Sequence, residues 1–164
     1  MEKEKFNITN LVNNDGCFDL QFRKDIRRER TNSPTYYRWK AQFVVTVPKE
    51  NVKVLERVKK IIGCGSVSIT RGQARFSVQN VNDISEVIVP FFRKNKLIDK
   101  KKKDFALWQK AVDIIYNNKG KHIVAWKKND LLSLVQIHES VAKYKHKPRQ
   151  AKWIGMAKSM TQSA

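Results

Sequence analysis

The sequence predicts an α+β fold, a four-stranded antiparallel sheet backed by helices in the order αββαββα, with further helices after it. Two pairs of segments alternate apolar and polar residues, and the segments around them space apolar residues as helices do. Glycine and proline mark the junctions. The 164 residues, 41% of them hydrophobic, suffice for one domain with a real core. We expect this domain to span residues 1–145 and a basic tail to span residues 146–164.

The first three elements are predicted to be a short helix and two long strands. The helix ends at Asp15-Gly16, where glycine permits a sharp exit because it tolerates a left-handed backbone. Residues 17–24 then alternate between apolar and polar side chains, as a half-buried strand does. A polar, basic loop ending at Pro34 separates them from a longer alternating segment over residues 36–47. The two segments predict an antiparallel hairpin with a long basic tip.

The next elements repeat this helix and strand order. Pro48 stops the long strand, and residues 49–62 show the apolar spacing of an amphipathic helix. Residues 66–70 and 73–79 predict two short strands around a two-residue turn. Further helices are predicted over residues 82–93, from a lysine run at residues 100–103 to Gly120, and over residues 130–144.

Charge is the most unusual property of the composition. The chain has 34 Lys and Arg against 15 Asp and Glu, a formal net charge of +19. Such an excess favours a polyanionic partner, with nucleic acid first and an anionic membrane surface second. The membrane alternative is weak because no predicted helix joins a basic face to a broad apolar face. No apolar run approaches the roughly 20 residues of a membrane span, and the two cysteines and three histidines lack metal-binding spacing.

One face of the predicted sheet is apolar, and the other is rich in Arg, Lys and Gln with almost no acids. Solvation alone explains polar residues there, but these side chains also read base edges and hold phosphates. The predicted contacts on this face are Gln21, Arg23, Arg38, Lys40, Gln42, Thr46, Arg75, Ser77 and Gln79. Basic loops and the tail add Arg27, Arg28, Arg30, Arg71, Lys145, Lys147, Arg149 and Lys152. Aromatic residues interleave the tail, which suits either nucleic-acid binding or simple solvation.

The first helix resembles the motif of the LAGLIDADG homing endonucleases. Leu11 and Val12 match its apolar pair, Asp15 its acid and Gly16 its closing glycine. The lysine-rich segment 100–105, which ends in Asp-Phe before an apolar helix, is similar to a second family feature. The resemblance spans residues 6–145 in element order and implies the fold of a single LAGLIDADG half.

The resemblance also implies chemistry. Asp15 would be the catalytic acid and a ligand of Mg²⁺, which prefers oxygen donors, and Lys101 would be the lysine that reaches the catalytic pocket. One-motif members act as homodimers, so that two acids meet at a scissile phosphate. The family's frequent residence in organelle genomes implies a mitochondrial or chloroplast location. Residues 1–5, which carry acids and no apolar core, do not have the pattern of a signal or transit peptide.

Three residues depart from the family pattern. Asn10 and Asn14 stand where small residues let two motif helices pack closely, and Val47 stands where a polar residue often lies near the metal-bound water. Two alternatives therefore stay open. One is a non-cleaving protein that needs no metal and binds structured RNA, as an intron maturase or as a ribosome-associated component beside ribosomal proteins. The other is an active, Mg²⁺-dependent homodimer that cuts a near-palindromic duplex DNA site.

Overall fold

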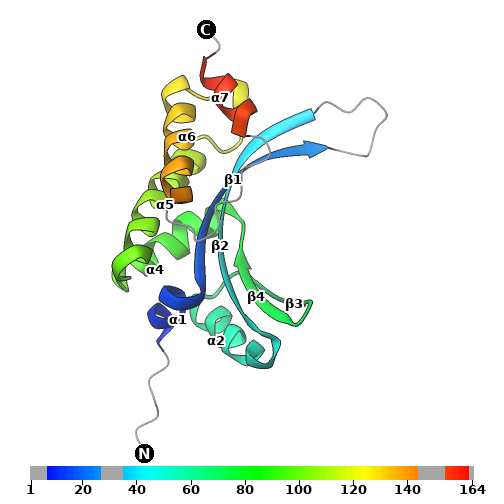
Figure 1. Cartoon of the computed structure of the whole chain (residues 1–164), viewed down its shortest axis with the longest axis vertical. Helices are drawn as coiled ribbons and strands as arrows, with labels where there is room; N and C mark the ends of the chain where they lie inside the picture. The colour runs from blue at the N-terminus through cyan, green and yellow to red at the C-terminus, as the bar shows by residue number, and fades with distance from the viewer. Residues whose placement is uncertain (1–6, 27–34, 144–153, 163–164) are drawn as a thin grey trace, which may run out of the picture. The chain divides into compact units, whose positions relative to one another are not determined.

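The computed structural model describes residues 7–26, 35–143 and 154–162 (Figure 1). Its strands are β1 (Gly16–Ile26), β2 (Thr35–Pro48), β3 (Ser66–Thr70) and β4 (Gln73–Val78). Its longer helices are α1 (Ile8–Asp15), α2 (Val52–Ile62), α5 (Asp99–Asn117), α6 (Lys128–Lys143) and α7 (Ile154–Gln162). Shorter helical segments are η1 (Lys49–Asn51), α3 (Val81–Asp83), η2 (Ile84–Ile88), α4 (Val89–Lys94) and η3 (Ile123–Ala125).

The four strands form one sheet in the order β1-β2-β4-β3. Strand β4 pairs antiparallel with β2 on one side and with β3 on the other. The α+β class, the four-stranded antiparallel sheet and the element order are therefore confirmed.

The chain divides into two compact units, and the long strands β1 and β2 contribute to both. Unit 1 consists of residues 1–19 and 42–105, and unit 2 of residues 20–41 and 106–164. The predicted boundary between domain and tail, at residue 145, lies outside the described residues and stays a prediction.

The core of unit 1 is built around a cluster of four phenylalanine rings. Phe18 on β1 and Phe43 on β2 stack with centroids 5.3 Å apart, and Phe92 on α4 and Phe105 on α5 lie 5.6 and 5.3 Å from Phe18. Tilted and edge-on aromatic pairs of this kind add to the stabilisation from burial. Because Phe18 is the third residue of β1, the cluster also fixes the point where α1 gives way to the sheet.

Helix α2 covers β3 and β4 within unit 1 (Figure 1). Its buried residues, Leu55, Val58 and Ile62, follow the predicted helical spacing. The helix ends at Gly63, whose φ of +90° is the left-handed conformation that favours glycine at a helix end.

The helix predicted over residues 82–93 is not regular. Its middle is the π-helical segment η2, in which the Val89 N–H donates to the Ile84 carbonyl five residues earlier. The cause is Pro90, which has no N–H and whose ring crowds the carbonyl of the preceding turn. A widened turn before the proline accommodates both constraints.

In unit 2, aromatic residues of the two long strands pack against the helices. Phe22 stacks on Tyr37 at 5.7 Å and lies 5.1 Å from Trp39, while Trp39 contacts His138 on α6 at 6.0 Å. Helix α5 ends at Asn117, three residues before the predicted end at Gly120. The next side chain, that of Asn118, ends the helix by donating to the Ile114 carbonyl at 2.8 Å.

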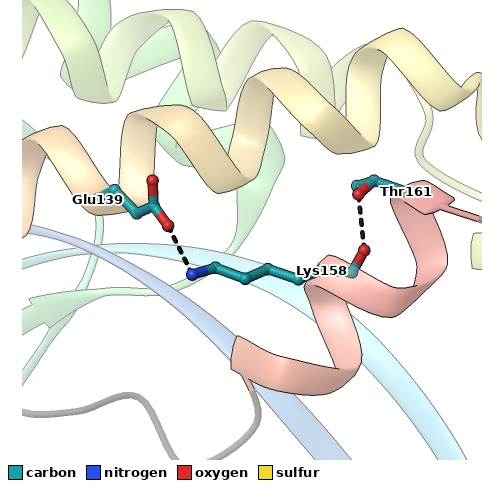
Figure 2. A network of polar contacts seen from close by, with 3 residues as sticks. All are labelled: Glu139, Lys158 and Thr161. Atoms are coloured by element: carbon teal, nitrogen blue, oxygen red, sulfur yellow. Dashed lines mark hydrogen bonds and ion pairs between the residues drawn. The ribbon is translucent and has the colours of Figure 1, made fainter.

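Helix α7 lies within residues 146–164, for which a basic tail is predicted. It packs on α6, with Ala157 buried and an ion pair of 2.8 Å between Lys158 Nζ and Glu139 Oε1 (Figure 2). The Thr161 hydroxyl donates to the Lys158 carbonyl at 2.6 Å. The predicted contacts Lys145, Lys147, Arg149 and Lys152 lie outside the described residues.

Candidate nucleic-acid interface and acidic helix end

Helix α1 has one buried side and one exposed side. The Asn7 side chain caps its start by accepting from the backbone N–H groups of Thr9 and Asn10, at 3.0 and 3.3 Å. Ile8 and Val12 are buried, whereas Asn10, Asn14 and Asp15 are exposed. The two asparagines are four residues apart and so share one face of the helix.

Gly16 holds Asp15 at the last position of α1 for a steric reason. Its backbone is extended, with φ −83° and ψ 154°, so the expected left-handed exit is wrong. A β-carbon at this residue would lie 2.6 Å from Val12 Cγ1 and 2.7 Å from the Val12 carbonyl oxygen. Only glycine lets the chain leave the helix this closely and enter β1 at once.

Both predicted catalytic residues lie in unit 1. The Asp15 carboxylate is exposed at the end of α1, and the Lys101 side chain is half-buried near the start of α5. Asn13 links the two helices, because its Oδ1 accepts from the Ile98 N–H at 3.3 Å, one residue before α5. Sequence reasoning missed Asn13, since nothing local distinguishes it from Asn14.

The metal-binding capacity of this helix end is limited to one side chain. Asp15 offers a hard carboxylate, the donor that Mg²⁺ prefers. Among the described residues, no group of three or more His, Cys, Asp and Glu could hold a metal ion. The Asp15 carboxylate therefore fits Mg²⁺ in chemistry, but one carboxylate does not complete a site, and further oxygen ligands are needed.

The outward face of unit 1 is polar with little charge. Arg75 and Gln79 are exposed and Ser77 is half-buried, while the alternate residues of β4 are buried. Across the strands Arg75 lies between Thr46 on β2 and Ser68 on β3. The predicted outward orientation of Arg75, Ser77, Thr46 and Gln79 agrees with this alternation. Sequence reasoning missed the exposed Ser66, Ser68 and Thr70 of β3, because short uncharged side chains give no charge signal.

Gln42 is the exception on this face, and its predicted exposure is wrong. Only 7% of it is exposed, and its Nε2 donates to Asp19 Oδ2 at 2.9 Å. Val44, on the same side of β2, is 7% exposed. Asp19 is the only acid predicted for this face, so the single acid and the amide satisfy each other within the sheet.

The outward face of unit 2 is cationic. Arg23 and Arg38 are exposed, and Gln21 and Lys40 are half-buried. Arg27, Arg28 and Arg30, predicted for the hairpin tip, lie outside the described residues. The role of these residues in binding stays a prediction.

The turn between β3 and β4 places an arginine in an unfavourable conformation. Arg71 and Gly72 have φ of +49° and +79°, the pair of positive values that a type I′ turn requires. Glycine, asparagine and aspartate suit the first position, and a side chain such as arginine costs roughly 1 kcal/mol or more there. Arg71 is exposed at the tip of this turn.

A polar hollow of about 400 Å³ lies where β3 and β4 meet α3 in unit 1. Ser66, Ser77, Asn80 and Asp83 are among its lining residues. Burial, and secondarily the carboxylate of Asp83, raises the pKa of the neighbouring Cys64 thiol. The thiol is therefore held in its protonated, unreactive form near neutral pH.

The family model described as LAGLIDADG endonuclease matches residues 8–112, which include α1, the whole sheet and most of α5. The chain belongs to the LAGLIDADG endonuclease family. The predicted family is thereby confirmed.

Two curated relatives are much longer than this chain. The "Probable intron-encoded endonuclease 3" of Neurospora crassa is 28% identical over 112 residues, which are 67% of this chain and 20% of that protein. The "Probable intron-encoded DNA endonuclease 1" of Mycosarcoma maydis is 33% identical over 101 residues, which are 61% of this chain and 34% of that protein. The matched part thus spans between a fifth and about a third of these relatives.

Solved structures of the LAGLIDADG fold superpose on most of the chain. The homing endonuclease I-TnaI matches with a TM-score of 0.69 and 17% identity, over 94% of this chain and 95% of that one. I-SmaMI bound to an uncleaved DNA target with calcium matches with a TM-score of 0.73 and 22% identity, over 93% of this chain and 49% of that one. The chain therefore has the fold of all of the first protein and of about half of the second.

Among the helices of the described residues, none is both long and apolar enough to cross a membrane.

Proposed function

We propose that this LAGLIDADG protein binds duplex DNA with its outward sheet face and, as a homodimer, hydrolyses phosphodiester bonds with Mg²⁺. The observation that carries the proposal is the exposed Asp15 carboxylate, held at the end of α1 by the close contact between Gly16 and Val12. The names of the curated relatives, both endonucleases, support the same activity. Their intron-encoded origin supports an organellar location.

Pairing of two copies through α1 would complete the metal site. A single Asp15 is too few ligands, and a second copy supplies another carboxylate while the DNA supplies phosphate oxygens. Asn10 and Asn14 on the exposed side of α1 each carry both donors and acceptors, so they would hydrogen-bond across such a pair at a wider spacing than small residues allow. When bound, Mg²⁺ polarises the phosphate and lowers the pKa of a bound water.

Lys101 would act beside this site. The hydrogen bond from Ile98 to Asn13 fixes the start of α5 against α1, and Lys101 follows three residues after Ile98. A half-buried ammonium there would stabilise the negative charge that develops on the phosphate.

A second function is favoured by Val47. Its side chain is 6% exposed and pairs with Ala74 in the core, so this position offers no polar group to orient a metal-bound water. The same fold would then bind structured RNA without cleavage, as a maturase or a ribosome-associated protein.

Incubation with a randomised duplex library and Mg²⁺ tests the proposal, with Asp15→Asn as the variant. Asp113→Asn, which removes an exposed acid from α5, is the matched control. We expect the wild type and the control to cut a defined site, and Asp15→Asn to bind that site without cutting it. A wild type that binds duplex DNA or RNA but cuts nothing would support the second function. A wild type that binds no nucleic acid would overturn both.

A further inference from the structure

Residues 118–127 join α5 to α6 in unit 2, and together with Lys128, the first residue of α6, they are here called the lysine loop. Lys119, Lys121, Lys127 and Lys128 are all exposed in this loop. Between Asn118 and Asp130 the sequence has no acid. Asp130 itself is engaged, because its Oδ2 accepts from the buried Asn118 amide at 3.2 Å. The loop is thus a concentrated positive surface.

Hydrogen bonds give the lysine loop a defined shape. The Lys121 N–H donates to the Asn118 carbonyl at 3.1 Å, and the Trp126 N–H donates to the Ile123 carbonyl at 3.1 Å. The Trp126 indole N–H closes the loop by donating to the Lys121 carbonyl at 3.2 Å. A loop held in this way presents its cations with little ordering cost on binding.

The lysines of the loop differ in whether their positions stabilise the neighbouring helices. Lys119 does, because it follows the negative end of α5 and its ammonium lies 4.0 Å from the Tyr116 ring centroid. Lys127 and Lys128 stand at the start of α6, since the Leu131 N–H bonds to the Lys127 carbonyl. Cations are unfavourable at a helix start, so this placement favours an anionic partner for the loop.

The chemistry of the loop favours nucleic acid over a membrane. The large apolar side chain that the loop exposes is Val124, which is 88% exposed. Burying one valine yields only about 1.5–3 kcal/mol, and membrane-surface binding calls for a broad apolar face. Four lysines that contact backbone phosphates instead release the counterions held there, and this release favours binding.

We propose that the lysine loop is a second nucleic-acid contact, which binds backbone phosphates apart from the outward sheet face. Helix α6, which the loop enters, contacts Trp39 on the inward side of β2, whereas the neighbouring Arg38 and Lys40 belong to the outward side. The proposal rests on the proposed nucleic-acid binding of the chain. The phosphates could belong to duplex flanking the target or to RNA, and the test separates these sources.

The experiment compares the triple variant Lys121→Ala/Lys127→Ala/Lys128→Ala with a matched control, Lys53→Ala/Lys59→Ala/Lys60→Ala. The control removes three exposed lysines from α2. Dissociation constants for a duplex DNA and for a stem-loop RNA are measured over a series of KCl concentrations. We expect the loop variant to reduce the magnitude of the slope of log K against log salt by about 2–3, because three phosphate contacts are lost. The control should change it by less than half of that.

Charge-retaining replacement of the same three lysines by arginine should restore the slope. The nucleic acid that loses affinity in the loop variant identifies the source of the phosphates. If the wild type binds nucleic acid and the loop alanine variant has the same salt slope as the α2 control, the loop proposal is wrong while the proposed function stands. If the loop variant loses only its binding to phosphatidylserine vesicles, the partner is a membrane and the proposal is likewise overturned. A wild type that binds neither nucleic acid refutes the proposed function itself.

Discussion

Unit 1 and unit 2 differ in the chemistry that they present outward. The outward residues of unit 1 are mostly short and uncharged, such as Ser66, Ser68 and Ser77, with Arg75 among them. Those of unit 2 include the exposed Arg23 and Arg38. Short uncharged groups can act only on base edges or as single hydrogen-bond partners, whereas cations gain mostly from phosphates, although arginine also reads guanine. If the chain binds nucleic acid as proposed, we expect unit 1 to contribute more to sequence discrimination and unit 2 more to affinity.

The largest expected effect is on the aromatic cluster of unit 1. Phe92→Ala removes a ring that contacts Phe18, Phe43 and Phe105. We expect a loss of about 3–5 kcal/mol in the free energy of unfolding, measured with denaturant. A loss below about 1 kcal/mol would mean that this cluster does not anchor unit 1.

The next largest effect comes from a comparison of two glycines, one in each unit. Gly16→Ala forces a β-carbon against Val12 and should destabilise the protein by about 1–3 kcal/mol. Gly155→Ala is the control in unit 2, because an added β-carbon there meets nothing within 4 Å. Since Gly155 lies in α7, that change should stabilise the helix by up to about 1 kcal/mol. Equal effects of the two changes on the thermal midpoint would contradict the steric account of Gly16.

The division between affinity and discrimination is sharpened by two changes on the outward face. Arg38→Ala in unit 2 should lower the salt slope of binding by about 0.9 without changing sequence preference. Ser77→Ala in unit 1 should leave the slope unchanged and weaken the preferred site by about 0.5–1.5 kcal/mol, one neutral hydrogen bond. Competition binding against a library of single-base variants distinguishes the two results. If Arg38→Ala changed the sequence preference and Ser77→Ala changed the salt slope, the proposed difference between the two units would be wrong.

The smallest expected effect concerns the strained turn. Asparagine suits a positive φ, so Arg71→Asn should raise the free energy of unfolding by roughly 1 kcal/mol. Because one phosphate contact is lost, the same change should reduce the magnitude of the salt slope by about 0.9. Thermal denaturation and salt titration of the same variant measure both. Higher stability with unchanged binding would mean that Arg71 contacts no nucleic acid.

The fold was largely predictable because its signals are local. Period-two alternation locates β4, where Ala74 and Phe76 are buried and Arg75 is exposed, and helical spacing locates α2. The exposed acid at the end of α1 followed from the motif. The residues that were missed depend on tertiary contacts instead.

Gln42 shows why. Its alternation is that of an exposed residue, yet Asp19 on the neighbouring strand binds its amide, and no pattern along one strand predicts a partner on another. Asn13 links α1 to a backbone N–H 85 residues later in the chain. Helix α7 lies in the stretch predicted as a basic tail, and its packing on α6 is a tertiary contact that a charge pattern does not reveal.

The position of β3 at the edge of the sheet bears on aggregation. An edge strand exposes unpaired backbone groups to which another chain can add. Strand β3 has only five residues, three of them the serines and threonine of its outward face, opposite Arg75 and Ser77 on β4. A short strand with polar side chains on its outward face is a poor template for such addition, even though Ile69 on its other face is 56% exposed. The small side chains that we propose for contact with bases would therefore also discourage strand-to-strand association between copies.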